Sequence, residues 1–116
     1  MLTSFGKKLR TIRIEHDEIL KDMAQKLGVT VAYLSAVENG KRDVPDNWID
    51  IIATEYQLSE NEKEILQYAA YENKDSLKIG VNDIDIEEKK LALAFARSFK
   101  NLTAEDKAKL NEIFRK

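Results

Sequence analysis

Two adjacent cations, Lys41 and Arg42, are the residues of this sequence best suited to binding chemistry. They follow Asn39-Gly40, a dipeptide typical of turns, so both charges are expected in a loop. Cations in a loop can neutralise phosphate groups and release the counterions that those phosphates hold. The alternative interpretation is that Lys41 and Arg42 are solvated loop charges without a partner.

The sequence does not indicate a metal site, a nucleotide-binding site or a catalytic site. The chain has no cysteine, which excludes disulfides, thiolate metal sites and cysteine nucleophiles. It has one histidine, His16, and the sequence near His16 lacks the further ligands that a metal ion needs. The four carboxylates between residues 83 and 88 lack the spacing and central glycine of an EF-hand loop. No phosphate-binding loop, dinucleotide fingerprint or nucleophile elbow occurs. We therefore expect no enzyme activity, no metal and no cofactor.

Length, composition and charge limit the classes of protein to which this chain could belong. The 116 residues have room for one domain, or a small domain with an appendage, and one proline with four glycines favours helices. No apolar run could span a membrane and no apolar signal core follows Met1, so we expect a cytoplasmic protein with no membrane contact. Residues 1–45 carry eight Lys/Arg against six Asp/Glu, although the net charge of the chain is −2. A local positive excess of this kind is compatible with nucleic-acid binding.

Apolar spacing and end signals predict five short helices in the first part of the chain. Gly28 ends the second helix and Thr30 caps the third. Pro45 and Asp46 open the fourth helix, and Ser59 begins the capping box of the fifth. These helices are the elements that must position the loop cations.

The C-terminal extension, residues 73–116, has a different pattern. Apolar residues alternate from Leu77 to Val81, which predicts a short strand or an extended arm. A lone strand cannot satisfy its own backbone, so this segment should pair with a copy from a second chain, lie against a helix or serve as a flexible linker. Two helices follow, one after Asp85 and one beginning at Thr103. Their apolar side chains exceed what two such helices can bury on each other, so they should dock on the N-terminal domain, on a second copy or on another protein.

The segment 23–42 has the pattern of two helices joined by a tight turn. Ala24 is small enough for close helix crossing, Gly28 permits the turn and Val29 fills the space between the helices. The second helix is anchored by Leu34 and Val37.

This segment resembles the Xre-type family of helix-turn-helix regulators, which includes the lambda-like phage repressors. The resemblance covers about residues 5–58 and is strongest in Met23-Ala24 through Gly28 and in Glu38-Asn39-Gly40-Lys41-Arg42, followed by Pro45. It implies an all-α fold, with a five-helix lambda repressor-like DNA-binding domain over residues 1–72 and the extension over residues 73–116. It also implies a sequence-specific transcriptional regulator of double-stranded DNA.

The resemblance places helix 30–38 in the major groove. Its base-facing positions fall on Val31, Ala32, Ser35 and Ala36. Its phosphate-contacting positions fall on Tyr33, through the hydroxyl, and on the loop residues Asn39, Gly40, Lys41 and Arg42. Glu38 is expected to hold the fold together rather than to touch DNA.

The sequence departs from the family pattern at two places. Of the base-facing residues only Ser35 offers a hydrogen-bonding group, so we expect modest specificity, with T-rich half-sites read through thymine methyls. The start of the second helix has Ile19-Leu20-Lys21 where the family has Ser or Thr and then Gln. We therefore expect Asp17 to cap this helix and Lys21 to replace the glutamine as a phosphate contact.

Two functions fit this sequence. The first is a dimeric repressor, whose extension pairs two chains so that the recognition helices lie roughly 34 Å apart, one turn of DNA. The alternative is an antitoxin that binds its toxin through residues 73–116 and represses their shared operon.

Overall fold

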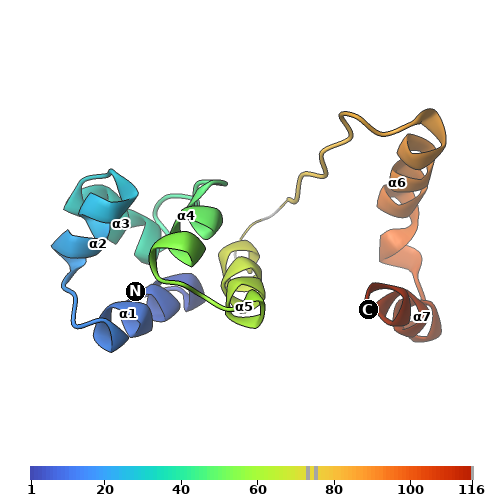
Figure 1. The fold of residues 1–116 in the computed structure, drawn as a ribbon. Helices are drawn as coiled ribbons and strands as arrows, with labels where there is room; N and C mark the ends of the chain where they lie inside the picture. Colours follow the sequence, from blue (N-terminus) through green and yellow to red (C-terminus); the bar gives the residue numbers. More distant parts are fainter. Residues whose placement is uncertain (73, 75, 116) are drawn as a thin grey trace. The chain divides into compact units, whose positions relative to one another are not determined.

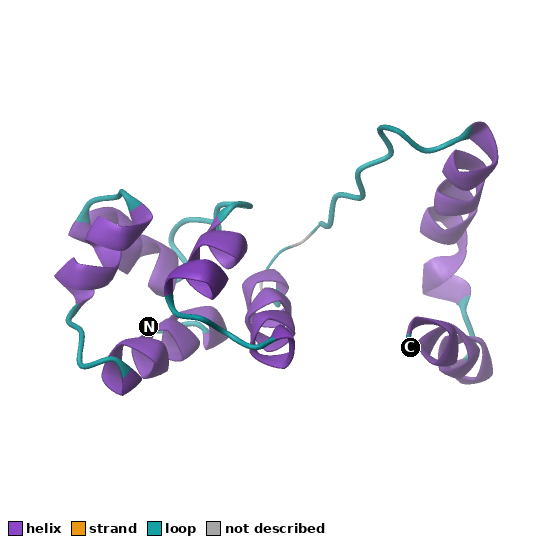
Figure 2. Cartoon of the chain, in the orientation of Figure 1, coloured by secondary structure: helices purple, strands orange, loops and turns teal. Residues whose placement is uncertain are grey.

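The computed structural model of the chain is all-helical, as predicted, and describes residues 1–72, 74 and 76–115. Figures 1 and 2 show the helices in chain order. They are α1 (Ser4–Glu15), α2 (Leu20–Leu27), α3 (Val31–Glu38), α4 (Trp48–Glu55), α5 (Glu60–Tyr71), α6 (Ile86–Ser98), the 3-10 helix η1 (Phe99–Asn101) and α7 (Ala104–Phe114). The chain divides into two compact units, Met1–Leu77 and Lys78–Lys116. The predicted boundary adjoins Asn73, which lies outside the described residues.

Local capping explains where most helices begin and end. The side chain of Thr30 accepts a hydrogen bond from the Tyr33 N–H and so starts α3. Ser59 and Glu62 form a reciprocal capping box at the start of α5. Gly28, with φ of 70°, adopts the left-handed conformation that ends α2. These ends confirm the sequence prediction.

Two predicted helix starts are wrong. Asp17 does not cap α2, because its φ of 54° belongs to the turn before the helix; Ile19 is the N-cap, and its N–H donates to the Asp22 carboxylate at 2.9 Å. The fourth helix begins at Trp48 rather than at Pro45. The Trp48 N–H bonds back only three residues to the Pro45 carbonyl, at 3.1 Å, so residues 45–48 form a turn that leads into α4.

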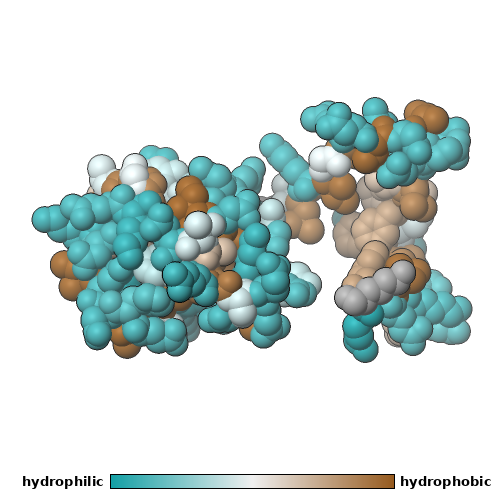
Figure 3. All heavy atoms as spheres, in the orientation of Figure 1, coloured by the Kyte–Doolittle hydropathy of each residue, from teal (hydrophilic) through white to brown (hydrophobic). Residues whose placement is uncertain are grey.

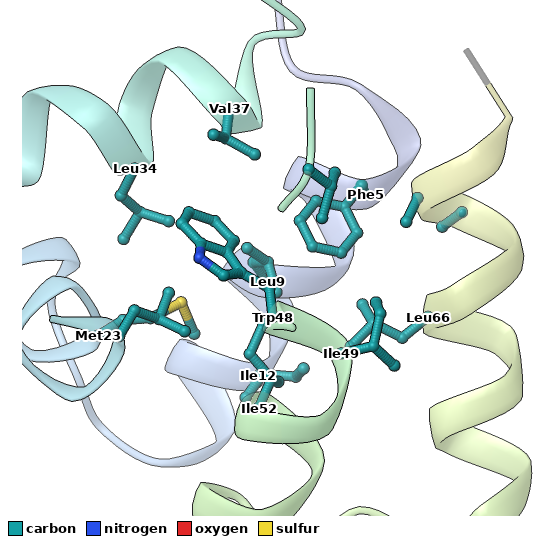
Figure 4. Packing of buried hydrophobic residues seen from close by; sticks show 14 of the residues in the cluster. Phe5, Leu9, Ile12, Met23, Leu34, Val37, Trp48, Ile49, Ile52 and Leu66 are labelled. Carbon is teal, nitrogen blue, oxygen red and sulfur yellow. The ribbon is translucent and has the colours of Figure 1, made fainter. Parts of the chain in front are cut away.

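The N-terminal unit is built around one apolar core. Figure 4 shows the Trp48 ring in the middle of the labelled core side chains. Trp48 is 3% exposed and Tyr56 is 4% exposed, which confirms their predicted core positions. The core also takes side chains from every helix of the unit and, at Val44, from the loop between α3 and α4. The helical residues are Phe5, Leu9, Ile12, Met23, Ala24, Leu27, Leu34, Val37, Ile49, Ile52, Leu66, Ala69 and Ala70.

The C-terminal unit buries none of its described residues. The rings of Phe95 and Phe99 stack with their centroids 6.1 Å apart, yet both remain more than 40% exposed. Figure 3 shows hydrophobic side chains on the surface of this unit. Residues 76–81 form neither helix nor strand, so the predicted short strand does not form in this part of the chain. A strand needs a neighbouring strand for its backbone bonds, and the described part of this chain offers none.

Among the described residues, no helix is both long enough and apolar enough to cross a membrane.

Candidate nucleic-acid interface

Helices α2 and α3 form a compact helix-turn-helix. Ala24 is 2% exposed where the two helices meet, and its carbonyl accepts a hydrogen bond from the Val29 N–H at 3.0 Å. This bond closes the turn around Gly28. Leu34 and Val37 are 0% and 1% exposed, so they anchor the inner side of α3 to the core. The opposite side of α3 therefore faces away from the core.

The four predicted base-facing residues share that outer side of α3. Val31 and Ala32 are exposed, and Ser35 and Ala36 are half-buried one turn later. Their spacing of one and four residues puts them on one helical face. The surface is small and apolar apart from the Ser35 hydroxyl, so it can approach a flat partner closely.

The loop after α3 is held in a fixed conformation. Gly40 adopts φ of 76°, and the Lys41 N–H donates to the Ala36 carbonyl at 2.9 Å, which is the bonding of a Schellman turn. The Asn39 side-chain amide donates to the Ser35 carbonyl at 2.9 Å, so this predicted phosphate contact also caps α3. Lys41 and Arg42 are both exposed at the end of this turn. The loop thus presents two cations beside the outer side of α3.

Tyr33 lies between the core and the loop cations. Its ring centroid is 6.0 Å from that of Trp48 and 5.0 Å from the Arg42 guanidinium carbon. The sequence predicted a phosphate contact for the Tyr33 hydroxyl, but it did not predict this contact between the ring and Arg42. The signal available was an aromatic residue nine positions before an arginine, which is too general to predict a stack.

Glu38, at the end of α3, is clamped by α1. Its carboxylate pairs with both terminal nitrogens of Arg13, at 2.5 and 3.1 Å, and both residues are buried. Its backbone carbonyl accepts from the N–H and the hydroxyl of Thr3, at 2.9 and 3.0 Å. This bonding confirms the structural role predicted for Glu38. Because one residue receives all four bonds, α1 fixes the position of α3 at its C-terminal end.

Gly6 allows α1 to approach α3 closely enough for this clamp. A Cβ atom at Gly6 would lie 2.3 Å from the Glu38 carbonyl oxygen, which is far inside the van der Waals limit. Any larger residue at this position must therefore move α1 away from α3. The sequence carries no obvious mark of this requirement, since Gly6 has an ordinary helical conformation.

A second polar cluster joins the α1–α2 connection to α4. Glu18 is held by a salt bridge from Lys26, and the Tyr56 hydroxyl donates to its carboxylate at 2.6 Å. Burial raises the pKa of Glu18, but the bonds from Lys26 and Tyr56 outweigh this effect and leave the pKa below its usual value. Burial and then the bond to Glu18 raise the pKa of Tyr56. His16 packs edge-on against the Tyr56 ring, with centroids 5.0 Å apart.

The remaining predicted residue, Lys21, is exposed in the first turn of α2. It belongs to the helix that precedes the turn, whereas Lys41 and Arg42 follow α3. Within the described residues, no group of three or more His, Cys, Asp or Glu side chains is arranged to hold a metal ion.

The segment that contains α2 and α3 is similar to known proteins. A family model described as helix-turn-helix matches residues 9–62, which contain α2, the turn and α3. The HTH-type transcriptional repressor RghR of Bacillus subtilis (strain 168) is 43% identical over 44 residues, which are 38% of this chain and 33% of that protein. The match thus spans about a third of that relative's length. No solved structure matches the chain significantly. Residues 9–62 of this chain thus match a helix-turn-helix family, in agreement with the resemblance to Xre-type, lambda repressor-like regulators.

Proposed function

We propose that this chain is a sequence-specific DNA-binding transcriptional regulator, a dimeric repressor that places α3 in the major groove. The observation that carries the proposal is the outer side of α3, small and exposed, with Lys41 and Arg42 fixed beside it. The helix-turn-helix family match and the similarity to a transcriptional repressor support it. Access to the chromosome requires a cytoplasmic location, which is part of the same proposal.

Base recognition relies on shape and methyl contacts more than on hydrogen bonds. Val31, Ala32 and Ala36 can pack on thymine methyls, and Ser35 supplies the single hydrogen-bonding group. We expect T-rich half-sites in a selection from random DNA. Enrichment of a G-rich motif without thymine methyl positions would contradict this reading of α3.

The phosphate contacts lie at the edges of that surface. We assign them to Tyr33, Lys21 and the loop residues Asn39, Gly40, Lys41 and Arg42. Each cation that neutralises a phosphate steepens the salt dependence of binding by about one unit of slope. The two exposed loop cations are therefore expected to supply about two units.

The first experiment is a fluorescence-anisotropy titration against DNA from upstream of the gene, at several salt concentrations and with unrelated competitor DNA. The Lys41→Ala, Arg42→Ala double variant should bind more weakly, with a salt slope smaller by about two. The Lys89→Ala, Lys90→Ala variant removes the same charge from α6 and should bind like the wild type. Binding no tighter than to competitor, and unchanged in the loop variant, would refute the proposal.

The second copy in the dimer is proposed to dock on α6 and α7. Phe95, Phe99, Leu102, Leu110 and Phe114 line a shallow groove between these helices. A unit of this size, in which none of the described residues is buried, lacks the core that independent stability requires. The two helices and η1 carry six Lys/Arg and five Asp/Glu, so charge opposes self-association only weakly.

Sedimentation velocity of the full chain tests the dimer. The Phe95→Glu, Phe114→Glu variant should shift the chain from dimer to monomer, whereas Ile14→Glu, at an apolar position 67% exposed in α1, should not. A wild-type chain that remains monomeric while binding DNA would refute the dimer. It would favour the second candidate, an antitoxin whose apolar groove binds a toxin.

A further inference from the structure

We infer that Tyr33 is a positioning residue whose ring, supported by Trp48, holds the Arg42 guanidinium in place for a DNA phosphate. This inference rests on the proposed function. It concerns the ring of Tyr33, and so it differs from a phosphate contact by the hydroxyl.

The aromatic pair provides a rigid base for the arginine. Trp48 is buried at the start of α4, and the Tyr33 ring lies 6.0 Å from it at an angle of 55°. This separation is within the range in which aromatic rings attract each other. The Tyr33 N–H also donates to the Thr30 side chain at 3.0 Å, so the backbone of Tyr33 is fixed by the helix cap.

The Arg42 guanidinium completes this arrangement on the solvent side. It lies 5.0 Å from the centre of the Tyr33 ring, inside the distance for a cation–π interaction. The Schellman turn fixes the chain just before Arg42, through the bond from the Lys41 N–H to Ala36. Both partners therefore have a constrained backbone, and the stack restricts the remaining rotation of the arginine side chain.

Such restriction is useful for binding because a free arginine loses rotational freedom when it contacts a phosphate. A side chain that is already ordered loses less conformational entropy on binding, and the affinity for DNA is correspondingly higher. Arg42 and Lys41 are neighbours with the same charge, but the aromatic stack is formed by Arg42. We therefore expect Arg42 to contribute more to DNA affinity than Lys41.

The test compares variants that separate the ring from the hydroxyl. Tyr33→Phe keeps the ring and removes only the hydroxyl with its proposed phosphate contact, so it should weaken DNA binding less than a variant without the ring. Tyr33→Leu keeps apolar volume without the ring and should weaken binding roughly three- to ten-fold. In an Arg42→Ala background the difference in DNA affinity between Tyr33→Leu and Tyr33→Phe should largely disappear. Thermal unfolding of each variant verifies that titrations are made on folded protein.

A second measurement does not depend on DNA. In the free protein the Tyr33 ring current should move the side-chain proton resonances of Arg42 upfield, in the wild type and in Tyr33→Phe but not in Tyr33→Leu. An Arg42 resonance without this shift overturns the inference, whatever the DNA affinity.

The binding data can also contradict it. A loss in Tyr33→Phe equal to that in Tyr33→Leu would assign the role to the hydroxyl. A difference between Tyr33→Leu and Tyr33→Phe that persists without Arg42 would assign the role to packing. Unchanged or tighter binding by Tyr33→Leu would mean that the stack competes with the phosphate. If the wild type binds no DNA, the proposed function and this role fail together, while the Arg42 resonance still reports whether the stack exists.

Discussion

The N-terminal unit buries its apolar side chains, whereas the C-terminal unit leaves them in solvent. Phe5 and Leu9 of α1 are 2% and 0% exposed, but Leu91 of α6 and Phe114 of α7 are 73% and 71% exposed. Both units have well-capped helices, so local structure is not what separates them. The difference shows that helix formation and core formation are separate requirements, and that α6 and α7 meet only the first.

The sharpest form of this comparison is to produce the two units separately. Residues 1–77 should unfold cooperatively at a temperature independent of protein concentration, because their core is internal. Residues 78–116 should gain helix as concentration rises, because association supplies the missing burial. Circular dichroism across a hundred-fold range of concentration measures both. A concentration-independent, cooperative transition in residues 78–116 would contradict the contrast.

Removing one aromatic ring from each unit should have unequal costs. Trp48→Ala empties the middle of the core and should lower the free energy of unfolding by about 3–5 kcal/mol. Phe99→Ala removes a ring that is 46% exposed and should cost the N-terminal unit nothing measurable. Urea denaturation, followed by Trp48 fluorescence in the wild type and Phe99→Ala and by circular dichroism in all three, gives the values. Equal losses would mean that Phe99 is part of the same core.

The buried ion pair offers a comparison at the level of charge. Glu38→Gln leaves the Arg13 guanidinium buried without its counter-charge and should cost about 3–5 kcal/mol. The control is Glu105→Gln in α7, where Lys109 lies 3.6 Å away on the surface and the expected cost is below about 1 kcal/mol. Denaturant titration at neutral pH compares the two. A small effect of Glu38→Gln would show that α1 holds α3 through Thr3 and packing alone.

The smallest expected effect concerns acid. Because the folded-state pKa of Glu18 is lowered, Glu18 stabilises the fold above the unfolded value of 4.5, and this stabilisation is lost as pH falls through the folded pKa. Glu18→Gln should therefore be less stable than the wild type at neutral pH, with the difference shrinking below pH 4.5. Thermal unfolding between neutral and acidic pH measures it. A constant difference across that range would assign the effect of Glu18 to shape rather than charge.

Local signals in the sequence predicted most of the helix boundaries. Thr30, Ser59 and Thr103 cap helices as predicted, and the helix expected after Asp85 has that residue as its cap. A cap depends on hydrogen bonds between residues three positions apart, so the information lies within a short segment. The start of α4 was misplaced because Pro45 fits both a turn and a helix, and the choice depends on how Trp48 enters the core.

The sequence by itself determined the helix-turn-helix, since Ala24, Gly28 and Val29 act on near neighbours and the outer positions of α3 follow from helical periodicity. Only the tertiary structure decided what holds that helix in place. Arg13 and Glu38 are 25 positions apart, and they meet because Gly6 lets α1 cross close to α3. The contact of the Tyr33 ring with Trp48 has the same origin, because it joins α3 to α4. Contacts between distant segments follow from how whole helices pack, and that packing is the joint result of every core residue.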